Sequence, residues 1–243
     1  MSAWRIAIPN ALTMSNLLFG TLSIIYGFNA EYDFAVYCIF AGAVMDLFDG
    51  AAARALGVAG PLGVQLDSLA DVVTFGVAPG LLLYNLNSEL VTRYYQDGGR
   101  LWGSSILPQA ALLIPLFSAL RLARFNISTD QQTHFIGLPT PANALVLSFF
   151  PLYWTFGGNA TDIDWLHPTF IAIWCTLSSL MLVANVPLLS LKFSTYGWMG
   201  NQFRYGMILS VAVCIAVFGW RGILFSLLLY LFFSKLHFKR YKP

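Results

Sequence analysis

Four aspartates lie close together in the N-terminal third of the sequence, inside or at the edges of two apolar stretches. Asp46 and Asp49 are three residues apart, and Asp67 and Asp71 are four residues apart. Each pair shares one face if its segment is helical, because residues three or four positions apart are neighbours on a helix surface. Acidic side chains within a membrane span are costly and usually functional. The spacing therefore predicts two acidic helix faces with a chemical role.

The segment between the two pairs predicts a tight turn. Residues 57–62 contain two glycines and a proline, which favour reversal of the chain. We therefore expect the two acidic faces to meet near a membrane boundary, where four carboxylates repel one another unless protons or cations neutralise them. A set of oxygen ligands suits Mg²⁺, Mn²⁺ or Ca²⁺ better than zinc. The sequence predicts a divalent-cation site, with Mg²⁺ or Mn²⁺ as the cofactor.

Small residues and one arginine accompany the acids. Gly50 and Ala53 lie on the first face and Gly63 on the second, which leaves room for a bulky ligand near the backbone. Arg54 can neutralise a phosphate oxygen. A metal-bound pyrophosphate fits this pattern. In the alternative interpretation, the small residues only let helices pack and the acids form salt bridges, but Arg54 is the sole base nearby.

The composition predicts an all-α, polytopic membrane protein with one membrane-embedded domain over residues 1–243. Of the 243 residues, 58% are hydrophobic and 10% are charged, whereas soluble domains have about 25% charged residues. There is too little polar surface to coat a soluble globule. The net charge of +2 and the scattered bases indicate no nucleic-acid partner.

Eight apolar stretches approach the length that crosses a bilayer. Their predicted ranges are 12–29, 34–53, 66–87, 104–124, 140–157, 168–190, 205–219 and 221–237. Segment 89–102 is expected as the longest outside loop. With the N-terminus in the cytoplasm, ten Lys and Arg residues fall inside and three outside, as the positive-inside rule requires. Both termini and the acidic faces are therefore expected on the cytoplasmic side.

The acidic faces resemble a known signature. The pattern Asp46, two residues, Asp49-Gly50, two residues, Ala53-Arg54, eight residues, Gly63, three residues, Asp67, three residues, Asp71 resembles, without a departure, that of the CDP-alcohol phosphatidyltransferases. Three further segments, 67–79, 121–126 and 137–144, are similar to the bacterial phosphatidylserine synthase branch. The similarity extends from residues 9–16 to about residue 190.

The resemblance implies a homodimer in the bacterial inner (cytoplasmic) membrane, with six core helices over about 9–190 and two extra helices over about 205–237. It implies transfer of the phosphatidyl group from CDP-diacylglycerol to the hydroxyl of L-serine, with release of CMP, in a cavity open to the membrane lipids and the cytoplasm.

The same resemblance implies roles for the signature residues. Asp46, Asp49 and Asp67 bind the cation. Asp71 shares in cation binding and is the favoured general base. The nucleotide and its phosphates are lined by Gly50, Ala53 and Arg54, and Gly63 is a close-approach or packing position beside them.

Other polar residues are weaker candidates. Thr13 and Asn16 share a face of the first helix and are candidates for contact with the nucleotide. Thr74, one turn beyond Asp71, either faces the acceptor or bonds its own helix backbone.

Two arginines near the inside end of the fourth span are candidates for the acceptor site. Arg121 and Arg124 either bind the serine carboxylate or the diphosphate, or act as positive-inside anchors. Asn126 is a candidate for the serine ammonium group, and Asn143 is a comparable polar candidate.

Two alternative functions differ from serine transfer. A related enzyme would use glycerol phosphate, inositol, an ethanolamine-type alcohol or an archaeal ether-lipid donor, although the segments 74–79 and 137–142 favour serine. A secondary transporter also uses intramembrane acids, but it should place them at the midplane in paired halves, and the sequence contains no second copy.

Overall fold

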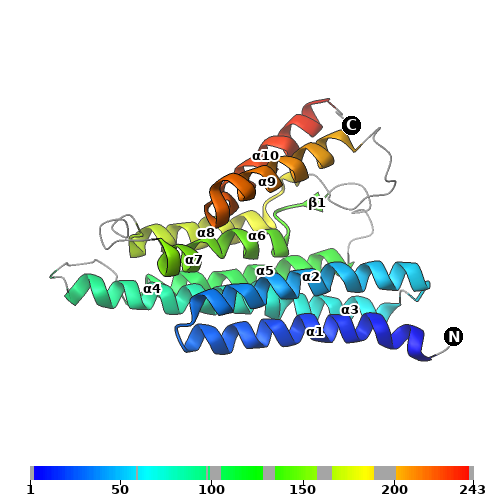
Figure 1. Ribbon diagram of the computed structural model, residues 1–243, viewed down its shortest axis with the longest axis horizontal. Helices are drawn as coiled ribbons and strands as arrows, with labels where there is room; N and C mark the ends of the chain where they lie inside the picture. Colours follow the sequence, from blue (N-terminus) through cyan, green and yellow to red (C-terminus); the bar gives the residue numbers. More distant parts are fainter. Residues whose placement is uncertain are drawn as a thin grey trace.

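The structure is a computed structural model that describes residues 3–58, 60–96, 98, 105–127, 135–157, 166–188 and 201–240. Long helices run along one axis of the molecule (Figure 1). The elements are α1 (Ala3–Phe28), α2 (Tyr32–Leu56), α3 (Pro61–Asp71), the π-helix η1 (Val72–Val77), α4 (Ala78–Gln96), the 3₁₀ helix η2 (Pro108–Leu112), α5 (Leu113–Ile127), β1 (Phe135–Ile136), α6 (Thr140–Leu147), α7 (Phe149–Phe156), α8 (Pro168–Val183), β2 (Pro187–Leu188), α9 (Gln202–Phe218), the 3₁₀ helix η4 (Gly219–Arg221) and α10 (Gly222–Arg240). The predicted all-α fold is confirmed.

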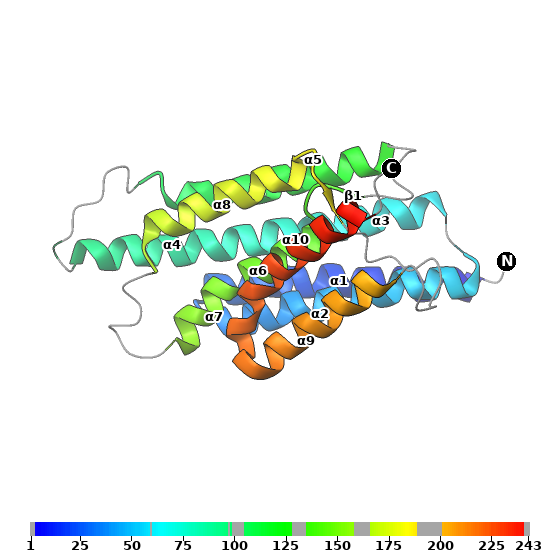
Figure 2. The same cartoon turned by 90° about the horizontal axis from the view of Figure 1, so that it is seen from above.

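Each of the eight predicted spans contains a helix. Five described segments are long and apolar enough to cross a membrane: Trp4–Phe28, Tyr32–Leu56, Pro61–Gln96, Pro108–Ile127 and Tyr205–Ser226. The last of these includes the η4 turn, where the chain reverses between α9 and α10, which lie side by side in Figures 1 and 2. A shorter apolar helix is α8. The chain is an integral membrane protein.

Several predicted boundaries were wrong, and α1, for example, begins at Ala3 and not at residue 12. Residues 89–96, expected in an outside loop, continue α4, because the buried Leu86 and Leu90 extend its apolar face. Span 140–157 is broken at Ser148, since Pro151 lacks an N–H to donate to Leu147.

The helix in the predicted span 168–190 is shorter than expected: α8 ends at Val183, and the chain becomes extended at Ala184. Pro187 disfavours helical backbone at Val186. The carbonyl of Val186 instead accepts from the N–H of Gly137 at 3.0 Å, and β2 pairs antiparallel with β1. These bonds join the segment after α8 to the segment before α6.

Both termini lie at the same end of the helix bundle in both views (Figures 1 and 2). The end of α2 and the beginning of α3 lie at this end too, whereas α4 ends at the opposite one. The turn between α2 and α3 and both termini therefore lie at one end of the helix bundle, and the side of the membrane on which this end lies stays a prediction.

Candidate active site

Three aspartates from two helices come together as a carboxylate cluster. One carboxylate oxygen each of Asp46, Asp49 and Asp67 lies within 4.8 Å of the other two. A tight turn brings α2 and α3 into this arrangement, because Gly57 caps the C-terminal end of α2 in the left-handed region (φ 64°) and Pro61 is the first residue of α3. The two acidic faces predicted from the sequence do meet.

The cluster has the chemistry of a divalent-cation site. All its donors are carboxylate oxygens, the ligands that Mg²⁺ and Mn²⁺ prefer. Like charges this close are unfavourable in apolar surroundings unless a cation balances them. The residues present therefore fit a divalent cation.

Asp71 is buried next to the cluster, at the last position of α3. Its Oδ1 accepts a hydrogen bond of 3.2 Å from Nδ2 of Asn16 on α1. It also interacts electrostatically with Asp46, Asp67 and Asp49. One oxygen of Asp71 is thus oriented by α1, beside the residues that can hold a cation.

The sequence analysis missed the π-helix η1 that follows Asp71 directly. Single π-helical turns are rare in proteins, and those that occur are often found at functional sites. Pro79 was the available signal, because its ring has no N–H for the carbonyl of Phe75 and would clash with it in a regular α-helix. The wider turn accommodates the proline and changes the direction of side chains just beyond Asp71.

Thr13 also contacts an acid. The Thr13 hydroxyl lies 2.7 Å from Oδ2 of Asp49 and 3.0 Å from the carbonyl of Pro9, and its single hydrogen serves one of these acceptors at a time. Thr13 and Asn16 therefore fix the aspartates from α1. Their predicted contact with the nucleotide stays a prediction.

Thr74 ties η1 to α1. Its buried hydroxyl donates to the backbone carbonyl of Asn16 at 3.0 Å. Two glycines make this approach possible, since a Cβ at Gly42 would lie 2.6 Å from Cγ2 of Thr74 and a Cβ at Gly20 would lie 2.8 Å from its Cα. The Thr74 hydroxyl, a candidate for contact with the serine acceptor, therefore uses its hydrogen in a bond within the protein. This bond supports the backbone beside Asp71.

The other signature residues are Gly50, Ala53 and Arg54 on α2 and Gly63 on α3. A Cβ at Gly50 would lie 3.4 Å from Nη1 of Arg54, so this guanidinium folds back over its own helix. Arg54 is exposed and interacts electrostatically with Asp49. A Cβ at Gly63 would meet no described atom within 4 Å. No described packing contact requires glycine there, and close approach of a ligand stays the prediction, as does the role of neighbouring Ala53.

The structure separates the two candidate arginines on α5. Arg121 is buried and its Nε has no hydrogen-bond partner among the described residues, whereas Arg124 is exposed. Arg121 also interacts electrostatically with Asp71. Asn126 donates from Nδ2 to the Ser68 hydroxyl at 2.9 Å and thereby links α5 to α3. Of these residues, Arg121 is best placed to meet a ligand beside Asp71.

Among the other buried polar atoms that lack a hydrogen-bond partner in the described part of the chain, three lie on α5 and α6. They are Oγ of Ser118 on α5 and, one turn apart on α6, Oγ1 of Thr140 and Nδ2 of Asn143. Both helices pack against η1. Buried polar groups are nearly always hydrogen-bonded, so these atoms beside η1 are candidates for contact with a polar ligand. Sequence analysis missed Ser118, a single polar residue in an apolar stretch, and Thr140, which stands between two prolines.

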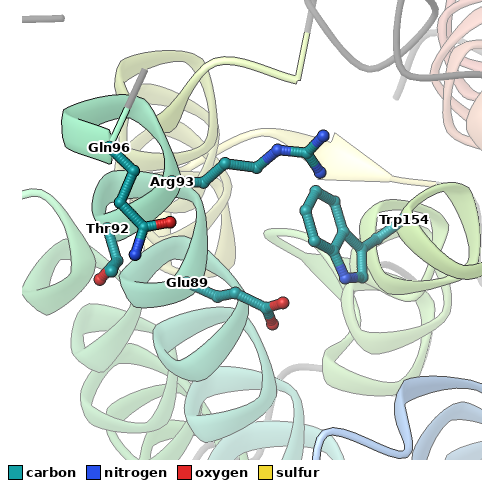
Figure 3. Close-up of a pocket in the computed structure, with 5 residues that line it drawn as sticks. All are labelled: Glu89, Thr92, Arg93, Gln96 and Trp154. Carbon is teal, nitrogen blue, oxygen red and sulfur yellow. The ribbon is translucent and has the colours of Figure 1, made fainter. Parts of the chain in front are cut away.

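A separate cavity of about 540 Å³ lies at the C-terminal end of α4, far from the aspartate cluster (Figure 3). It is lined by Glu89, Thr92, Arg93, Gln96 and Trp154. The Arg93 guanidinium stands 5.6 Å from the centre of the Trp154 ring, and Glu89 accepts a 2.7 Å hydrogen bond from the Tyr32 hydroxyl. No predicted site residue lines this cavity.

The chain is similar to several known proteins that share one name. The chain is 33% identical over 189 residues to the CDP-diacylglycerol–serine O-phosphatidyltransferase of Mycobacterium leprae (74% of this chain, 57% of that protein). It is 38% identical over 141 residues to the enzyme of the same name from Helicobacter pylori strain J99 (57% and 54%). It is 32% identical over 214 residues to that of Methanocaldococcus jannaschii (88% and 85%).

The match spans little more than half the length of the Mycobacterium and Helicobacter relatives. A family model described as CDP-alcohol phosphatidyltransferase matches residues 6–191, a range that contains the whole aspartate cluster, Asp71 and Arg121. The chain therefore belongs to the CDP-alcohol phosphatidyltransferase family.

Proposed function

We propose that this chain transfers the phosphatidyl group from CDP-diacylglycerol to the hydroxyl of L-serine, forming phosphatidylserine and CMP. The observation that carries the proposal is the cluster of three carboxylates within 4.8 Å, with Asp71 and the buried Arg121 beside it. The names of the three relatives support the same donor and acceptor.

The donor side of the reaction belongs to α2 and α3. Asp46, Asp49 and Asp67 would hold Mg²⁺ or Mn²⁺, which when bound neutralises diphosphate charge and stabilises the departing CMP. Thr13 holds the Asp49 carboxylate in place. Arg54 is exposed on the same helix end and pairs with a phosphate oxygen.

The acceptor side needs a base and a directed nucleophile. Asp71 takes the seryl proton as the serine oxygen attacks the phosphorus that bears diacylglycerol, and the phosphorus–oxygen bond to CMP breaks with its electron pair leaving on CMP. Because Asn16 donates to Oδ1 of Asp71, Oδ2 is the oxygen that receives the proton. A direct attack of this kind inverts the configuration at phosphorus.

Arg121 binds the serine carboxylate in this proposal. Its buried guanidinium can form the paired hydrogen bonds that a carboxylate accepts, and its Nε has no partner among the described residues. Thr140 and Asn143 supply further unpaired polar atoms from α6. These replace Thr74 and Asn126 as the polar partners for serine, since both of the latter bond within the protein.

We expect the enzyme to accept L-serine and to reject ethanolamine, inositol and glycerol 3-phosphate. Ethanolamine lacks the carboxylate and would leave Arg121 unmatched, a loss of about 1–3 kcal/mol for a buried partner. In Arg121→Lys, which keeps the charge but loses the planar fork, the KM for serine should rise about tenfold while that for CDP-diacylglycerol is unchanged.

Arg93→Lys is the matched control, because Arg93 lies at the opposite end of the molecule. CMP release measured while each substrate is varied in turn separates the two sites. If Arg121→Lys weakens CDP-diacylglycerol alone, the arginine belongs to the donor site. Equal activity with inositol and serine would contradict serine as the acceptor.

We also propose that the protein is a homodimer in the bacterial inner membrane and that the aspartate cluster faces the cytoplasm. The orientation is testable in a variant whose native cysteines, Cys38, Cys175 and Cys214, are replaced. Two exposed residues are each changed to cysteine: Leu62, which is 72% exposed near the start of α3, and Gln96 at the end of α4.

In intact cells, an impermeant thiol reagent should label Gln96→Cys at once. Leu62→Cys should react only after the membrane is permeabilised, because the positive-inside rule places its side of the membrane in the cytoplasm. The reverse pattern of labelling would show that the proposed orientation is inverted.

A further inference from the structure

The C-terminal hairpin of α9 and α10 lies outside residues 6–191, the range matched by the family model. It nevertheless packs on the helices of that range, since α10 contacts α6 and β2 (Figures 1 and 2). Tyr230 of α10 is 6% exposed and belongs to a buried cluster with Leu138, Val146, Leu182 and Met207. The hairpin thus brings a polar side chain into contact with the buried part of the family-matched range.

Arg121 lies on the face of α5 that meets this buried cluster. Phe117, one turn earlier on α5, packs against the cluster, and residues four apart share a helix face. Arg121 and Tyr230 interact electrostatically, and both are almost fully buried. The guanidinium of Arg121 therefore has Tyr230 as a polar neighbour from the hairpin.

The packing of α5 against the continuous helical segment formed by α3, η1 and α4 places Asp71 at about the same height along the bundle as Arg121. The two helices run in opposite directions (Figure 1). A Cβ at Gly76 would lie 3.0 Å from Cβ of Ser118, and Asn126 bonds to Ser68. These two contacts bracket Asp71 and Arg121. Arg121 thus stands between the proposed general base and the hairpin.

We propose that Tyr230 is a positioning residue for Arg121, and that the α9–α10 hairpin thereby completes the serine pocket. The inference rests on the proposed function. A phenol oxygen can accept a hydrogen bond from the guanidinium, which orients the group but leaves its charge available to a carboxylate ligand. An acidic residue in the same place would cancel that charge. Serine recognition then depends on a residue outside the family-matched range.

Tyr230→Phe removes only the hydroxyl and tests the proposal in the full-length protein. We expect the KM for serine to rise about three- to tenfold, because one orienting hydrogen bond of ordinary strength is lost while the charge that binds the serine carboxylate stays. The KM for CDP-diacylglycerol and the kcat at saturating serine should not change. The control is Tyr37→Phe on α2, because Tyr37 is 48% exposed.

A double-mutant cycle with Arg121→Lys distinguishes a positioning role of Tyr230 from a merely structural one. If Tyr230 acts through Arg121, the KM for serine of the double variant will rise by less than the product of the two single-variant increases, because the effects of residues in contact are not additive. The melting temperature and Mn²⁺ binding of each variant check that the fold and the aspartate cluster are intact.

An unchanged KM for serine in Tyr230→Phe, or equal increases in the KM of both substrates, would overturn the positioning role. Independent, multiplicative effects of the two variants would overturn it as well. These results differ from failure of the proposed function, in which the wild-type protein itself would release no CMP when serine is supplied.

Discussion

Asp71→Asn is expected to lower kcat by about 10²–10⁴-fold, the range that a general base contributes. The change keeps the size of the side chain and an oxygen that can accept from Asn16, as Asp71 does at 3.2 Å. It removes the ability to take the proton of the serine hydroxyl. CDP-diacylglycerol and Mn²⁺ should therefore still bind to the variant.

The measurement is the rate of CMP release over a titration of the divalent cation at saturating serine. Asp33→Asn is the matched control, because Asp33 lies in the first turn of α2, at the opposite end from the aspartate cluster. Complete recovery of Asp71→Asn at high metal concentration would show that Asp71 is a metal ligand and not the base.

Asp49→Asn should act on the cation first and on turnover as a consequence. Asp49 is buried, contributes one oxygen to the cluster and accepts from Thr13 at 2.7 Å. Replacing a charged ligand by a neutral amide should weaken Mn²⁺ affinity by at least the roughly 10–100-fold loss typical of outer-shell partners. Thr13→Val, which removes such a partner, should weaken Mn²⁺ affinity by about tenfold.

Equilibrium binding of Mn²⁺ without substrates separates this effect from catalysis, with Asp33→Asn again as the control. Turnover of Asp49→Asn should recover in part at high metal concentration. Effects of several such substitutions will not add, because the residues act on one site. Wild-type Mn²⁺ affinity in Asp49→Asn would remove Asp49 from the cation site.

The aspartate cluster was predictable because its geometry is local. Asp46 with Asp49, and Asp67 with Asp71, are fixed by helical periodicity, and the turn at 57–62 is marked by glycine and proline. The positions of the helices were predictable for a similar reason, since each is an apolar run. Several helix ends and the break at Ser148 were misplaced, where buried leucines or prolines decided the boundary.

Contacts between distant segments were not predictable. Thr13 and Asn16 meet Asp49 and Asp71 across 36 and 55 residues of sequence, and nothing in the local pattern distinguishes such a contact from one with a ligand. The π-helix after Asp71 depends on how Pro79 is accommodated. Tyr230 joins the site only because the hairpin folds back onto α6.

The most direct measurement is made on the purified protein with CDP-diacylglycerol in detergent micelles, Mg²⁺ or Mn²⁺, and isotope-labelled L-serine. We expect CMP and labelled phosphatidylserine to appear in equal amounts, and neither to form when serine or the divalent cation is left out. CMP release that is independent of serine, or no CMP under any of these conditions, would contradict serine transfer at the aspartate cluster.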